Sequence, residues 1–249
     1  MTLINNRESN AVSGSEFIQN NINNNRIVRE SNALKEFLNG NIPDFLRNFV
    51  PIVVSSGGNT ITYMVMSDYL SIGSNEDYVR MPLNPLTAQK IADQYDCTLP
   101  TRKMVISIWE QSEYKLEPLP WGAPYDESMM SIERIKIHNS RIQEQLHGKD
   151  FTKLISGHKK DVVLSNKMYP NNSKKRVTIF GWIQPNGLPI QGMNYWSHED
   201  NYADYSHGIR LIANDVMVNN SPKRIQDVLK DATLSALLCD EGILNFLKY

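Results

Sequence analysis

The residues whose side chains could do chemistry are densest in the stretch Asn201–Leu211, with the sequence NYADYSHGIRL. Within it, His207 lies three residues after Asp204 and directly before Gly208. A histidine that is oriented by a carboxylate can act as a general base near neutral pH. Glycine lacks a side chain, so another backbone or a substrate could approach closely at this point. The stretch therefore predicts a catalytic base, His207, oriented by Asp204.

Aromatic and charged side chains surround this pair. Tyr205 precedes the candidate base, Arg210 follows it, and Trp196 lies upstream. Such groups on a turn beside a strand are typical of binding sites, and we expect these three residues to bind substrate. The alternative is a purely local role, in which the aspartate and the histidine fix a tight turn through hydrogen bonds.

Cys97 is the candidate nucleophile. It lies between two predicted helices, four residues before Thr101, which can cap the second helix. A helix N-terminus offers unpaired N–H groups and a positive potential, which lower the pKa of a thiol and make it nucleophilic. The alternative is that Cys97 packs as a small buried hydrophobic residue. Cys239, near the end of an apolar helix, is predicted to be structural.

Three histidines also raise the question of a metal site. His158, His198 and His207 could supply ligands together with nearby aspartates. Their spacing matches no short signature such as HExxH or paired CxxC, and the glycines form no phosphate-binding loop pattern. We therefore predict no metal and no cofactor, and keep a metal-assisted hydrolase as a third hypothesis.

The order of the helices and strands expected along the chain predicts an α+β fold. N-terminal helices and a hairpin come first, central helices follow, and a C-terminal antiparallel sheet is closed by short helices. Residues 1–14 are predicted to form a flexible tail, and 15–249 a single domain with a helical half (15–150) and a strand-rich half (151–249). The expected helices span 15–38, 85–95, 101 onward, 128–146, 225–229 and 232–238, and the expected strands span 50–54, 60–66, 161–164, 177–183, 188–190, 209–212 and 215–218.

The composition narrows the classes of partner. With 26 basic and 27 acidic residues the formal net charge is -1, so we expect neither nucleic acid nor an anionic membrane as a partner. No window approaches the roughly 20 apolar residues of a transmembrane helix, and the first ten residues lack the apolar segment of a secretory signal. We expect a cytoplasmic protein that is released by lysis or carried in a virion if it acts outside the cell. The composition does not indicate an oligomeric state.

Several stretches resemble a family of uncharacterised bacterial and phage proteins, namely GNIPDFLRNFVPI, LPTRKM, HKKDVVLS and DYSHGIRLI. This resemblance extends from about Gly40 onward and implies one integrated fold without an assigned activity. A second similarity is to cysteine peptidases of the NlpC/P60 type, which cleave peptidoglycan stems. It is carried by a cysteine near a helix start and by the runs KKDVVLS and RVTIFGW. In those peptidases the catalytic histidine opens the second run, where this chain has Lys175 and Arg176, so His207 would have to serve as the base.

These observations lead to two main hypotheses. The first is a Cys–His hydrolase that cleaves an amide bond, in a peptide or cell-wall substrate, with Cys97 as nucleophile, His207 as base and Asp204 as orienting group. The second is a non-enzymatic binding or assembly protein, encoded by a phage, in which the DYSHG turn is an interaction element or stabilises the local backbone.

Overall fold

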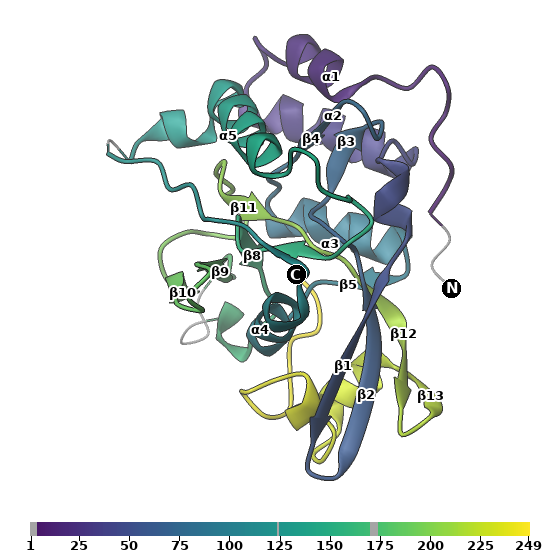
Figure 1. Ribbon diagram of the computed structural model, residues 1–249. Coiled ribbons are helices and arrows are strands. Elements are labelled where there is room, and N and C mark those ends of the chain that lie inside the picture. The colour runs from purple at the N-terminus through teal and green to yellow at the C-terminus, as the bar shows by residue number, and fades with distance from the viewer. Residues whose placement is uncertain (1–3, 124, 170–173) are drawn as a thin grey trace.

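The structure is a computed structural model that describes residues 4–123, 125–169 and 174–249. It has the predicted α+β fold, built around two larger sheets (Figure 1). The first sheet has the order β1–β2–β12–β13, with β5 also paired to β12. The second has the order β10–β9–β8–β11. Their bounds are β1 Val50–Ser56, β2 Asn59–Val65, β5 Cys97–Thr98, β8 Lys160–Val162, β9 Ile179–Ile183, β10 Pro189–Asn194, β11 His207–Gly208, β12 Ile212–Val218 and β13 Ser221–Arg224.

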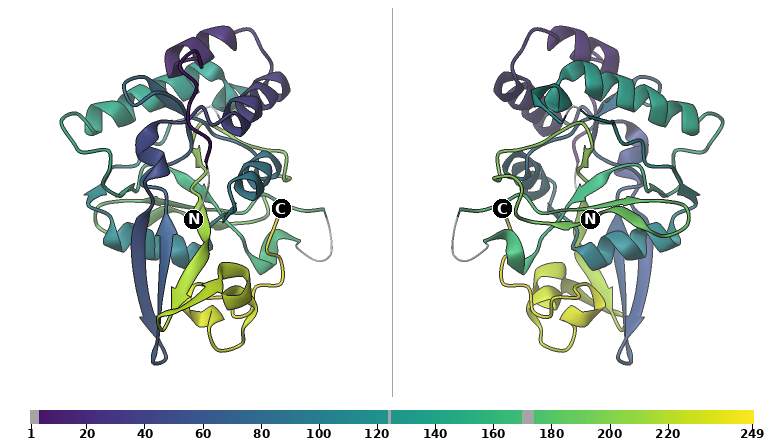
Figure 2. Two further views of the ribbon diagram at one scale, coloured as in Figure 1. Left: turned by 90° about the vertical axis from the view of Figure 1, so that its right-hand side faces the viewer. Right: turned by 90° about the vertical axis from the view of Figure 1, so that its left-hand side faces the viewer.

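Helices and short ribbons surround these sheets. Figure 2 shows α1, α2 and α5 together at one end of the molecule and the β1–β2 hairpin extending at the other. The helices are α1 Gly14–Asn20, α2 Arg26–Leu38, α3 Pro85–Gln94, α4 Arg102–Gln111, α5 Ile132–Gln145 and α6 Ile225–Lys230. The 3-10 helices are η1 Asp44–Arg47, η2 Glu127–Met130, η3 Asn166–Met168 and η5 Ser235–Leu237, and two short ribbons pair β3 Ser71–Gly73 with β4 Tyr78–Arg80 and β6 Tyr114–Lys115 with β7 Ile155–Ser156.

Local sequence signals account for most element boundaries. The β1–β2 turn contains Gly57 and Gly58 at φ +57° and +77°, a backbone conformation that glycine adopts without steric cost. Asn84 caps α3 by accepting a hydrogen bond from the Thr87 N–H, with a proline in the first turn. Thr101 caps α4 in the same way. These predicted starts are confirmed.

The long N-terminal helix predicted over 15–38 is wrong. The chain instead forms α1 and α2, because the asparagine-rich segment between them ends one helix and starts the next. The backbone N–H of Asn21 closes α1, and the Asn25 side chain caps α2 by accepting from the Val28 N–H. The described part of the predicted tail, residues 4–13, is held against the fold, since the Arg7 Nε donates to Asn41 Oδ1 at 2.9 Å.

The predicted C-terminal meander is also wrong in part. Of the expected strands 209–212 and 215–218, only Ile212 of the first joins the second in the single strand β12, which pairs with β2 and β5 in the first sheet, and 209–211 are not in a strand. The strand β11 pairs with β8 in parallel, not antiparallel, orientation. Ser221 and Pro222, expected to open a helix, begin β13. Residues from both predicted halves therefore share one sheet, and a continuous apolar core connects them.

No helix in the described ranges is both long enough and apolar enough to cross a membrane.

Candidate functional site

The parallel pair of β8 and β11 brings the two main chemical segments side by side. In its register His207 lies opposite Lys160, and Gly208 lies opposite Asp161. A Cβ atom on Gly208 would lie 2.6 Å from the Tyr69 ring, closer than any two such atoms can pack. The glycine is therefore required for β11 to approach, which agrees with the close approach expected from the sequence.

His207 is fully buried, and neither of its ring nitrogens has a hydrogen-bond partner among the described residues. Burial lowers the pKa of its imidazole to about 4, although the Asp204 carboxylate opposes that shift. The ring is consequently neutral at pH 7. A neutral imidazole with an open nitrogen can accept a proton, but a pKa so far below pH 7 makes it a weaker base than an ordinary histidine.

The Asp204 carboxylate fixes the turn that leads into β11. Its Oδ1 accepts from the Ser206 N–H at 2.8 Å and from the Ser206 hydroxyl, and its Oδ2 accepts from the Tyr202 hydroxyl at 3.2 Å. Burial favours the neutral acid, but His207, Lys160 and the bonds from Ser206 outweigh it, so the pKa lies below its usual range. Asp204 thus acts on His207 as a nearby negative charge, and it also forms the local turn that we considered as the alternative.

The segment between β10 and β11 covers this centre. The His198 ring stacks on the Tyr202 ring, with centroids 3.7 Å apart and planes 11° apart. The Tyr202 ring in turn meets His207 edge-on at 5.7 Å. Trp196, a predicted substrate-binding residue, lies in the same segment and is 60% exposed. Tyr202 is therefore one of the side chains that bury the His207 ring.

A strained tryptophan places a cation beside the histidine. The Lys160 ammonium lies 4.1 Å from the centre of the Trp182 ring. Trp182 has φ +50°, a left-handed conformation that costs of order 1–2 kcal/mol in a residue with a side chain. Its backbone N–H donates to Lys159 O at 2.9 Å, and its indole N–H donates to His158 O at 3.2 Å. Backbone strain of this kind is concentrated at functional sites.

Two groups of buried charged residues lie near strand β8. The first consists of Asp68, Arg80 and His158. Arg80 donates to Asp68 Oδ2 through Nε at 2.9 Å and through a second nitrogen, and His158 Nε2 lies 3.1 Å from Asp68 Oδ1. Asp68 and Arg80 are both buried. Arg80 and His158 hold the pKa of the Asp68 carboxyl below its usual range against the effect of burial. Burial in turn lowers the pKa of His158 to about 4.

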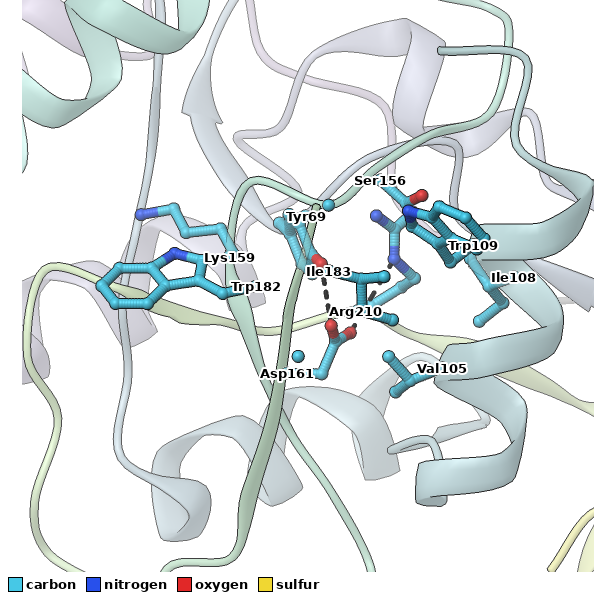
Figure 3. A pocket seen from close by; sticks show the side chains of 12 residues that line it. Tyr69, Val105, Ile108, Trp109, Ser156, Lys159, Asp161, Trp182, Ile183 and Arg210 are labelled. Carbon is cyan, nitrogen blue, oxygen red and sulfur yellow. Dashed lines mark hydrogen bonds and ion pairs between the residues drawn. The ribbon is translucent and has the colours of Figure 1, made fainter. Parts of the chain in front are cut away.

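The second ionic group lines a small cavity of about 10 Å³ (Figure 3). Tyr69 donates to Asp161 Oδ2 at 2.8 Å, and Arg210 Nε lies 4.0 Å from Asp161 Oδ1. Burial raises the pKa of the Asp161 carboxyl to about 7. Arg210 also donates to the carbonyls of Met66 and Ile155 at 2.8 and 2.6 Å. The Arg210 guanidinium therefore connects three segments of the fold. These contacts give no support to the predicted role of Arg210 in substrate binding.

Lys159 and His138 are functional candidates that the sequence reasoning missed. The buried Lys159 ammonium donates to Tyr205 O at 2.6 Å, and burial lowers its pKa to about 7. His138 on α5 is buried without a partner for either ring nitrogen in the described chain, and it meets the Tyr205 ring edge-on at 4.9 Å. Tyr205, a predicted substrate-binding residue, is itself fully buried, and its hydroxyl accepts from the Trp121 N–H. The charged run His158–Asp161 before an apolar strand was the available signal for this network.

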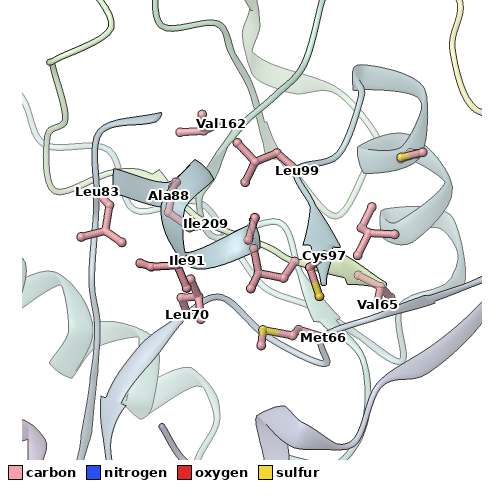
Figure 4. Close-up of a cluster of buried hydrophobic side chains, with 14 of the residues drawn as sticks. Val65, Met66, Leu70, Leu83, Ala88, Ile91, Cys97, Leu99, Val162 and Ile209 are labelled. Carbon is pink, nitrogen blue, oxygen red and sulfur yellow. The ribbon is translucent and has the colours of Figure 1, made fainter. Parts of the chain in front are cut away.

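Cys97 lies apart from this network. It is in β5, not at a helix start, and is 2% exposed within the main apolar core, beside Val65 and Met66 (Figure 4). Its thiol donates to Tyr95 O at 3.4 Å. Both His207 nitrogens lack a partner in the described chain, so no hydrogen bond joins the predicted base to the predicted nucleophile. The nucleophile role of Cys97 stays a prediction that this geometry does not support.

The third hypothesis, a metal-assisted hydrolase, requires several side chains that point at one metal ion. Among the described residues, no group of three or more histidine, cysteine, aspartate or glutamate side chains is arranged to hold a metal ion. His158 instead pairs with Asp68, and His198 stacks on Tyr202.

Comparison with known proteins adds no family to this description: no family model, no curated protein and no solved structure matches the chain.

Proposed function

We propose that this protein is a hydrolase that cleaves an amide bond by means of a water molecule activated by His207. The observation that carries the proposal is the state of that ring, which is buried, neutral at pH 7 and without a hydrogen-bond partner on either nitrogen in the described chain. A buried polar atom left unpaired costs about 1–3 kcal/mol. Such a cost is expected where the open nitrogen is needed for chemistry.

The surrounding charges support the same conclusion. Buried ion pairs seldom stabilise a fold more than apolar residues of similar size would. Here the Asp68–Arg80 ion pair is fully buried and contacts His158, two residues before strand β8. An arrangement that contributes so little net stability is better explained by a requirement for fixed charges at a reaction centre.

Each group has a defined role in this mechanism. His207 removes a proton from water as the water oxygen bonds to the carbonyl carbon. The negative charge of Asp204 stabilises the imidazolium that results. The Lys160 ammonium, opposite His207 in the register, stabilises the oxyanion. His207 then returns its proton to the leaving nitrogen as the C–N bond breaks, so that water is consumed and no thiol takes part.

The experiment is a hydrolysis assay on peptide and peptidoglycan-stem libraries, with cleavage read by mass spectrometry. We expect His207→Gln to lower kcat by about 10²–10⁴-fold, the usual contribution of a general base. The matched control is Cys97→Ala, which should keep kcat within about threefold of the unmodified protein because the thiol lies in the apolar core. Full activity of His207→Gln would refute the mechanism, and loss of activity in a folded Cys97→Ala would restore the thiol hypothesis.

A non-enzymatic binding protein is the second candidate. It is favoured by large apolar side chains exposed on and beside the edge strand β10, where Leu188 is 62%, Ile190 48% and Trp196 60% exposed. Exposed apolar residues beside an unpaired strand edge are typical of interaction surfaces. If His207→Gln leaves every assayed cleavage unchanged while Trp196→Ala abolishes capture of a host or phage partner, this candidate replaces the hydrolase.

A further inference from the structure

The chain contains two Asn–Gly pairs, Asn39–Gly40 and Asn186–Gly187. In such a pair the backbone nitrogen of the glycine can attack the side-chain amide carbon of the asparagine, which releases ammonia. Glycine favours this attack because it lacks a Cβ that would restrict the backbone. The attack still requires a suitable local geometry, and the structure places the two pairs in different surroundings.

Asn186 is exposed in the turn between β9 and β10. The Gly187 N–H donates to Gln184 O at 2.8 Å, and Gly187 has φ +89°, as in hairpin loops built on a type I turn. The Asn186 Oδ1 accepts from the Leu188 N–H at 3.0 Å. A side-chain oxygen that is bonded to the N–H two residues on folds back over the intervening peptide. The amide carbon of Asn186 is therefore held near the Gly187 nitrogen.

The Leu188 N–H also favours the attack electronically. It donates to the oxygen on which negative charge develops when a nitrogen bonds to the amide carbon, and a donor in that position stabilises the charge. The backbone of Gly187 also has room to rotate. A Cβ at this position would have the Trp109 ring as its nearest neighbour, at the distance of 3.4 Å.

Asn39 lies at the end of α2 and has neither advantage. Among the described residues, no N–H donates to its side-chain oxygen. The Gly40 N–H donates to Phe37 O at 2.9 Å, so this bond to the glycine is common to both pairs and does not distinguish them. Gly40 is buried, however, and a Cβ there would meet Asn5 O. Its backbone cannot rotate toward Asn39 without displacing the N-terminal segment.

We propose that Asn186 is a site of spontaneous deamidation in the folded protein, whereas Asn39 is protected from it. The Gly187 nitrogen gives its proton to water and bonds to the amide carbon of Asn186, and ammonia leaves as the C–N bond of the side chain breaks. Water then opens the five-membered imide at one of its two carbonyls. The products are aspartate and isoaspartate, with one water consumed and one ammonia released.

The modification changes the edge of the second sheet. Aspartate adds one negative charge to a chain whose formal net charge is -1, next to the exposed Leu188 and Ile190. Isoaspartate also lengthens the backbone of the turn by one carbon, next to the pairing of Pro189 with Ile183. The conversion needs neither a substrate nor a catalytic residue, so its failure and the failure of the proposed hydrolase are separate results.

The experiment compares the two asparagines within one sample of the full-length protein. The protein is incubated at pH 7.5 with and without urea, and peptide mapping by mass spectrometry follows the conversion of each amide to an acid. In the native protein we expect Asn186 to convert at least about tenfold faster than Asn39, since only Asn186 has the donor and the room to react. In urea the two rates should agree within about threefold, because the native contacts are lost. Native rates that are equal, or faster at Asn39, would overturn the proposal.

A pair of variants at one position tests the role of the donor. Leu188→Pro removes the N–H that bonds to Asn186 Oδ1 and should slow the native conversion by about 3- to 10-fold, the worth of one hydrogen bond. Leu188→Ala keeps the N–H and should leave the rate within about twofold. Equal rates in the two variants would show that the Leu188 N–H does not promote the reaction. If Leu188→Pro does not fold, the comparison of Asn186 with Asn39 still decides, because it uses the unmodified protein.

Discussion

Replacing His207 with phenylalanine should change how the stability of the protein depends on pH. The substitution keeps an aromatic ring next to Tyr202 and removes the two unpartnered nitrogens. An imidazole has a pKa of about 6.5 in an unfolded chain, whereas that of His207 is lowered to about 4 in the fold. Between these values the unfolded chain binds a proton that the folded protein does not bind. The stability contributed by the neutral ring is therefore complete above pH 6.5 and is lost as the pH falls toward 4.

The size of this effect follows from the shift. For pKa values of about 6.5 and 4, the linkage relation gives a loss of order 2–3 kcal/mol between pH 7.5 and pH 4.5 from this residue alone. The assay is urea unfolding of both proteins at the two pH values. We expect the fall in unfolding free energy to be smaller by roughly 2–3 kcal/mol in His207→Phe than in the unmodified protein. At pH 7.5 the variant should be at least as stable, because two unpaired buried atoms have been removed.

His147→Gln is the control, because it removes a histidine that is exposed just beyond the end of α5. An equal loss of stability in His207→Phe and the unmodified protein would refute the reasoning, because it would mean that the ring is not held neutral by burial. A variant that is more resistant to acid and also inactive would show that stability is given up at this position for catalysis.

Three further outcomes follow from the structure. Arg80→Met breaks the buried Asp68–Arg80 pair and should destabilise the protein by about 3–5 kcal/mol in urea unfolding, because the Asp68 charge is left uncompensated. If the added change Asp68→Asn recovers none of this loss, the loss of the pairing is not its cause. Gly208→Ala should lower stability by about 1–3 kcal/mol in the same assay, since its Cβ would overlap the Tyr69 ring, and a neutral effect would contradict the β8–β11 register. Cys97 should react with iodoacetamide far more slowly in the native protein than in urea, as read by mass spectrometry, and rapid native labelling would contradict its burial.

The sequence predicted those features that depend on neighbouring residues. Thr101 and Asn84 are followed at helical spacing by residues whose N–H groups they cap, so the starts of α3 and α4 could be located. Gly57 and Gly58 mark a turn that needs positive φ. The Asp204 turn, considered as an alternative, is local for the same reason, since its bonds come from Ser206 and His207.

The features that the sequence did not predict depend on pairing between distant segments. Cys97 follows a helix and precedes a helix cap, which made a helix start plausible, but its backbone pairs with Ala213 far along the chain. That pairing places its side chain in the core. Asp68 and Arg80 likewise look like ordinary polar residues until the fold brings His158 against them. Charge and periodicity hold no information on such partners.

The position of β12 has a consequence for the order in which the chain can fold. It lies between β2 and β5 and pairs with both, yet it follows β2 by about 150 residues. While the ribosome is still producing the middle of the chain, one edge of β2 has no neighbour, and the core that β12 later covers remains open to water. Long-range pairing of this kind slows folding and leaves an adhesive strand edge available for other chains. The nascent protein is therefore most vulnerable to aggregation in the interval before residues 212–218 emerge, and its first sheet is completed only once residues 221–224 have followed.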